Sequence, residues 1–153
     1  MRPGEADIDW LRRHHAEMRS GLRRLSEATD SLELCGELVN VVSACSAMQI
    51  ELGHHLAHGE RLATQLWGSH DPVVVELVHR SARLRQEVAQ LCLLAMRIEK
   101  PEPSAIDELI VSARRMHQAI ACHLCHEANK LLPLMSVQSA ENVTGAIARR
   151  CPK

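Results

Sequence analysis

The residues best suited to chemistry lie in one stretch, Cys122-His123-Leu124-Cys125-His126-Glu127. On a helix, His123 and Glu127 are one turn apart and point the same way, so an imidazole and a carboxylate can bind one metal ion. The same stretch also contains a Cys-x-x-Cys-His pattern, at Cys122, Cys125 and His126, which is typical of covalent haem attachment. The stretch therefore predicts either a His/Glu metal site or a haem site.

A weak internal similarity bears on this choice. His55-Leu56-Ala57-His58 repeats the His-Leu-x-His pattern of residues 123–126 but has neither the cysteine pair nor the glutamate. Covalent haem attachment also belongs to oxidising compartments, and residues 1–10 contain no apolar segment of a secretory signal. Both observations favour the histidine-based metal site.

Composition limits the class of protein. The 153 residues suit one compact domain, and the net charge of −1, with both signs interspersed, gives no footprint for nucleic acid or an anionic membrane. The longest apolar run, Leu91 to Met96, is too short to span a bilayer. We expect a cytoplasmic protein with no nucleic-acid or membrane partner, whose six cysteines are free thiols, core residues or ligands.

The elements that must position these side chains are helices. Apolar residues at alternating spacings of three and four predict helices over 7–28, from a break at 29–31 to Leu66, from Pro72 to about Glu99, and from Ser104 until Pro133 stops the fourth. Short loops between four long helices predict an all-α, up-down-up-down antiparallel four-helix bundle over residues 1–135. Residues 136–153 are expected to form a C-terminal helical tail with a short helix.

The third predicted helix carries apolar residues on a second face. Val75, Ala82, Leu93 and Met96 lie away from its main stripe. This arrangement predicts that the C-terminal segment or a second subunit, in a possible homodimer, covers that face.

The apolar stripes select particular polar residues as inward-facing. His15 fills the one missing slot in the stripe of the first helix, His55 lies on the stripe of the second, and His123 and Glu127 continue that of the fourth. His14 is expected to be flanking or exposed.

Other histidines lie off these stripes. His58 is about 60° round the helix from His55, near enough to lean inward. His79 is about 160° round from Ser81, which occupies the main stripe of the third helix, and is a weaker candidate ligand. His117 is expected at the surface.

Together the motifs resemble the hemerythrin-like (HHE cation-binding) family over about residues 8–134. They are Arg13-His14-His15-Ala16-Glu17, His55-Leu56-Ala57-His58, and His123 to Glu127 ahead of Leu131-Leu132-Pro133. The resemblance implies a four-helix bundle around a non-haem di-iron centre that binds oxygen, peroxide or nitric oxide. It also implies His15, His55 and His123 as ligands and Glu127 as a bridging carboxylate.

Two positions depart from the family pattern. The second helix has Gly59 where a carboxylate is expected, and alignment on Leu84-Arg85 places Ser81 where the third helix should carry a histidine. Three histidines and one carboxylate suffice for one metal ion with an open position. His58, His79, His126 or Cys122 are the candidates to replace the missing ligands.

Three functions remain open from the sequence. The first is a non-haem iron protein that binds or senses oxygen, peroxide or nitric oxide, with any catalysis carried by the metal. The second is a degenerate bundle that acts as an interaction or thiol/zinc-sensing module, and the third is a haem-binding bundle that uses Cys122, Cys125 and His126. Imidazole and carboxylate suit iron and zinc alike, so iron follows from the resemblance alone. Neither a nucleophile-plus-base arrangement nor a phosphate-binding glycine loop occurs, which disfavours a hydrolase or kinase.

Overall fold

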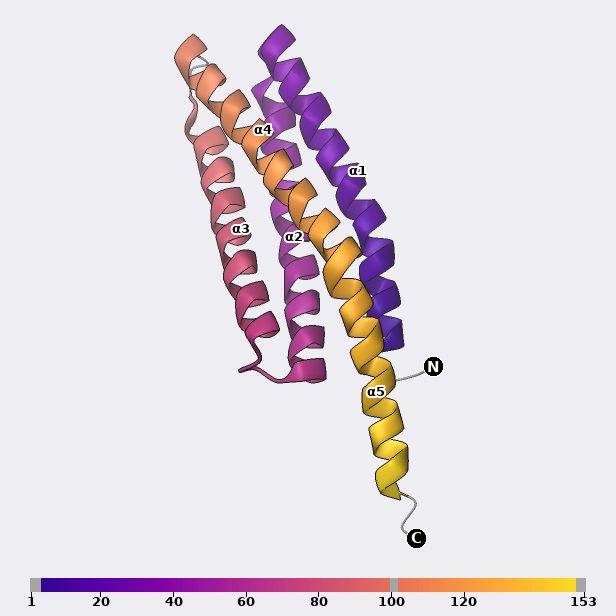
Figure 1. Cartoon of the computed structure of the whole chain (residues 1–153). Coiled ribbons are helices and arrows are strands. Elements are labelled where there is room, and N and C mark those ends of the chain that lie inside the picture. Colours follow the sequence, from indigo (N-terminus) through magenta and orange to yellow (C-terminus); the bar gives the residue numbers. More distant parts are fainter. Residues whose placement is uncertain (1–3, 100–101, 151–153) are drawn as a thin grey trace.

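A computed structural model of the protein describes residues 4–99 and 102–150, with backbone only from residue 145. Its elements are α1 (Glu5–Cys35), α2 (Leu38–Trp67), α3 (Pro72–Arg97), α4 (Pro103–His126), the π-helical turn η1 (Glu127–Leu131) and α5 (Leu132–Arg150). Successive helices run antiparallel. Helix α4, η1 and α5 form one continuous, kinked helical segment that extends past the α2–α3 turn (Figure 1). The predicted all-α, antiparallel four-helix bundle is confirmed.

The predicted break at residues 29–31 is wrong. Helix α1 continues through residues 29–31 and ends at Gly36, whose φ of 70° lies in the left-handed region that glycine adopts without strain. The Thr29 hydroxyl donates a 2.7 Å hydrogen bond to the Leu25 carbonyl, which satisfies it inside the helix. Leu34, which follows the predicted break, lies near the end of α1 and is exposed.

The predicted stop at Pro133 is also wrong. A proline inside an α-helix lacks an N–H donor, and its ring clashes with the carbonyl four residues earlier. Here the preceding turn is π-helical, and the N–H of Leu132 bonds the carbonyl of Glu127, five residues back. The wider turn accommodates the proline, so α5 follows directly instead of forming a separate short helix over 136–150.

Two apolar clusters fill the bundle. The larger lies toward the α1–α2 and α3–α4 loops and includes Met18, Met48, Leu52, Leu91 and Ile120. The smaller lies toward the α2–α3 turn and includes Ile8, Leu11, Leu62, Leu131 and Met135. A layer of buried histidines and one glutamate separates them, so apolar packing on both sides shields this polar layer from water.

The second apolar face of α3 stays uncovered. Val75, Leu93 and Met96 are exposed, because α5 packs against α1 and α2 instead. The expected cover by the C-terminal segment is therefore wrong for the described residues, while cover by a second subunit remains a prediction. Among the described helices, none combines the length and apolarity that a membrane crossing needs.

Candidate metal centre

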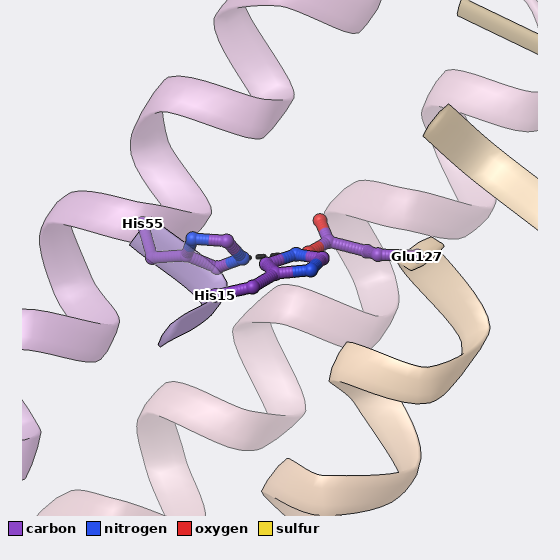
Figure 2. Close-up of side chains that lie close together, drawn as sticks. All are labelled: His15, His55 and Glu127. Carbon is purple, nitrogen blue, oxygen red and sulfur yellow. Dashed lines mark hydrogen bonds and ion pairs between the residues drawn. The ribbon is translucent and has the colours of Figure 1, made fainter. Parts of the chain in front are cut away.

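Three side chains from distant parts of the sequence meet between the apolar clusters. His15 comes from α1, His55 from α2 and Glu127 from the first residue of η1, and all three are buried. Their candidate ligand atoms lie within 4.8 Å of one another (Figure 2). This separation is close enough for one ion to bind all three.

A single carboxylate oxygen links the two histidines. Oε2 of Glu127 accepts hydrogen bonds from Nε2–H of His15 at 2.9 Å and of His55 at 2.6 Å. Burial alone would raise the pKa of Glu127, but these two hydrogen bonds hold that pKa below its usual range. Glu127 is therefore ionised, and a metal ion that replaces the two imidazole protons would meet two nitrogen ligands and a carboxylate.

His123 completes the cluster from the last turn of α4. Its side chain is buried, and its Nε2 lies 3.6 Å from Oε1 of Glu127, which is too long for a hydrogen bond. Neither ring nitrogen has a hydrogen-bond partner within the described residues. Burial lowers the pKa of His123 to about 4, although Glu127 opposes the shift, so at neutral pH the ring is uncharged and keeps a free lone pair.

His14, which was predicted to be flanking or exposed, is buried beside the cluster. The side chain is only 9% exposed, and its ring stacks on Trp10 with centroids 4.5 Å apart. Its Nδ1 lies 3.2 Å from Nδ1 of His55, and its Nε2 lies 3.3 Å from Oε2 of Glu17. Leu11, His14 and Met18 follow the same spacing of three and four as the main stripe, and this pattern was the signal that α1 buries a broader face.

These contacts place His14 behind His55. While Nε2–H of His55 donates to Glu127, its Nδ1 is free to accept a hydrogen bond from Nδ1–H of His14. With a metal on Nε2, His55 would carry its proton on Nδ1 and donate to His14, whose Nε2–H then faces Glu17. His14, with Glu17 beside it, is thus placed as an outer partner of the kind that orients metal-binding histidines.

Replacing His14 with alanine is expected to weaken metal binding about 10- to 100-fold, because His55 loses the partner that fixes its tautomer. Titration calorimetry with a divalent metal measures this change. The matched control is His54→Ala, which removes an exposed histidine next to His55. Equal affinities for the two variants would show that His14 does not orient His55.

Neither predicted substitute histidine joins the cluster. His58 stacks on Trp10, its Nε2 lies 3.1 Å from Oδ1 of Asp7, and its Nδ1 faces the Arg61 guanidinium at 2.8 Å. Burial, followed by the charge of Arg61, lowers the pKa of His58. His79 is exposed on the outer side of α3.

The two positions that depart from the family pattern do face the interior. Gly59 is buried, and a Cβ at this position would meet only Oε1 of Glu127, at 3.4 Å. Ser81 is fully buried, and its hydroxyl has no hydrogen-bond partner in the described part of the chain. Both slots therefore belong to the polar layer, as the stripes predicted, but neither supplies a strong ligand.

The cysteines of the haem-like pattern lie outside the polar layer. Cys122 and Cys125 are exposed on α4, and their sulfur atoms accept hydrogen bonds from Gln118 and Asn129. His126 is partly exposed and is not one of the residues that form the candidate metal site. No contact of these three residues supports the haem alternative.

Comparison of the chain with protein-family models, with curated proteins and with solved structures finds no match. The fold and the site therefore stand on the geometry above. The protein is a four-helix bundle with a buried His/Glu cluster, in which His15, His55 and Glu127 form a candidate metal site.

Proposed function

We propose that the protein is a non-haem metal-binding bundle in which His15, His55, His123 and Glu127 hold one ion. The observation that carries the proposal is His123, a buried imidazole whose two nitrogens have no hydrogen-bond partner among the described residues. An unpaired buried polar group costs about 1–3 kcal/mol. An ion that binds His123 together with His15, His55 and Glu127 would remove this cost, because it would give the His123 ring a partner.

The donor set fits a divalent cation. Three imidazole nitrogens and one carboxylate would bind the ion, with one negative charge among the ligands, and the apolar clusters on both sides shield the site from water. Such ligands suit iron, zinc and other divalent ions, so the choice of iron rests on the resemblance to hemerythrin-like proteins. Four protein ligands leave a position open, where bound iron would take oxygen, peroxide or nitric oxide.

The chain's own residues have defined tasks in this function. Glu127 would supply the negative charge, the three histidines would supply neutral donors, and His14 would hold the ring of His55 in place. If the protein is an enzyme, its chemistry is carried by the metal, because the polar layer contains no activated nucleophile.

A second function is favoured by one specific observation. Oε2 of Glu127 is fully satisfied by His15 and His55 without an ion. The cluster therefore also suits a degenerate bundle that keeps the network for stability and acts as an interaction or thiol/zinc-sensing module. This alternative predicts no redox-active metal and little change in fold on chelation.

Replacing His123 with alanine is expected to lower metal affinity at least about tenfold, because a ligand is lost while the hydrogen bonds of Glu127 remain. His117→Ala, on the same helix but outside the cluster, is expected to have no effect. Calorimetry and elemental analysis measure both. Equal losses in the two variants would exclude His123 as a ligand.

Elemental analysis and a visible spectrum of protein purified without added metal separate the functions. Iron with charge-transfer bands supports the proposed iron site. Zinc alone, or no metal, favours the degenerate module, and a Soret band would support haem.

A further inference from the structure

Helix α3 is the one side of the site without a ligand. His15, His55, His123 and Glu127 come from α1, α2, α4 and η1. Toward the interior, α3 presents Ser81, whose buried hydroxyl lacks a hydrogen-bond partner in the described chain. An ion held by the four ligands would therefore have its open side toward α3.

A groove reaches the site from the same direction. It lies between α3 and α4, has a volume of about 470 Å³, and is lined by residues that include Leu84, Ala119, Cys122 and His123. Leu84 lies one turn from Ser81 on the buried face of α3, and His123 is buried on the facing side of α4. The groove is thus lined both by the exposed Cys122 and by His123 of the candidate site.

The groove is positively charged. Arg80, Arg83 and Arg115 line it, against one acidic residue, Glu87. Arg83 pairs with Glu87 at 3.0 Å and Arg80 with Glu76 at 2.6 Å. The excess charge therefore rests on Arg115, which has no ion pair among the residues that the structure describes. Positive charge around a concave entrance raises the local concentration of anions and their association rate.

A neighbouring groove between α3 and α4 differs from this one in its charge and in its distance from His123. It has a volume of about 350 Å³, and it is lined by Glu87, Glu108, Arg97 and Arg115, with balanced charge. On α4 its lining residues run only from Glu108 to Met116, almost two turns before His123. Of these two grooves, only the one lined by His123 also has an excess of positively charged residues.

We propose that the α3–α4 groove is the entrance through which a small inorganic anion reaches the open side of the metal site. Arg115 draws the anion into the groove, and the Ser81 hydroxyl donates a hydrogen bond to it once it is bound. The inference rests on the proposed metal site, to which it adds a route and a class of ligand.

Azide binding to the cobalt(II)-loaded full chain tests the route, since cobalt(II) bands report on its ligands. Ala119→Trp should fill the groove and slow azide association at least about fivefold, with the cobalt content unchanged. Ala47→Trp is the matched control, because Ala47 lines a groove between α1 and α2 instead. Equal rates in the two variants would overturn the proposed route, whereas failure of every variant to bind cobalt would overturn the metal site itself.

Thiol labelling gives a second test without a core substitution. Cys122 lines the groove and Cys125 does not, yet both are exposed on α4. With Cys35 and Cys151 replaced by serine, each of the two is kept in turn and labelled with a bulky maleimide. A label on Cys122 should slow azide binding and one on Cys125 should not; equal effects would contradict the route.

The charge of the groove is tested separately. Arg115→Gln should slow azide association and reduce its dependence on salt, while Arg114→Gln should change neither. Arg114 is a suitable control because it pairs with Glu33 and Asp30 of α1. An unchanged rate in Arg115→Gln would show that the groove does not select anions.

Discussion

Replacing Glu127 with glutamine is expected to remove most metal binding while leaving the bundle folded. The amide oxygen can still accept hydrogen bonds from His15 and His55, so the network that joins α1, α2 and η1 survives. The ion, however, loses the one negative ligand of the site. The loss of affinity should exceed the roughly 10- to 100-fold expected when only an outer partner is removed.

Glu127→Ala separates metal binding from stability. This variant leaves two buried N–H donors without an acceptor, at a cost of about 1–3 kcal/mol each, so metal-free protein should unfold at lower urea concentration. Glu51→Gln is a control, because Glu51 pairs with Arg24 near the surface, where an ion pair contributes little. Calorimetry and urea denaturation measure the two effects. Wild-type metal affinity in Glu127→Gln would exclude the carboxylate as a ligand.

The sequence predicted the number, order and inward faces of the helices because long apolar stripes are a strong periodic signal. Their ends were less predictable. Thr29, Asp30 and Ser31 are typical of a helix start, yet Thr29 satisfies its hydroxyl on the Leu25 carbonyl within α1. Pro133 is typical of a helix end, yet the π-helical turn before it allows the helix to continue. Both errors arose because the sequence shows which residues favour a helix end. It does not show the local hydrogen bonds and the π-helical turn that let the helix continue.

Spacing placed His15, His55, His123 and Glu127 in the interior. The structure brings His15, His55 and Glu127 together, and Nε2 of His123 lies 3.6 Å from Oε1 of Glu127. The spacing did not reveal which of these side chains form hydrogen bonds with one another. The shared use of Oε2 of Glu127 depends on how closely three helices approach one another. The burial of His14 depends likewise on the packing of α1 against α2, which a single-helix stripe does not describe.

Gly59→Glu is expected to convert the site from one metal ion to two. A Cβ at position 59 would contact Oε1 of Glu127 at 3.4 Å, so a carboxylate there projects into the polar layer. Without metal, two buried carboxylates repel each other, and the variant should lose about 1–3 kcal/mol of stability. With metal, the added ligand should raise the stoichiometry and make folding depend on the ion.

Gly53→Glu provides the comparison, because a Cβ at Gly53 on the same helix meets no atom within 4 Å. Both substitutions remove a glycine from α2 and add one negative charge, so helix propensity and net charge change equally. Only the variant at position 59 should then show a larger rise in melting temperature on adding metal, and a higher metal content by elemental analysis. If the metal content of Gly59→Glu stays at the wild-type value, position 59 is not the missing ligand slot. The serine at position 81, which offers no imidazole ligand, would then account for the single ion instead of the glycine.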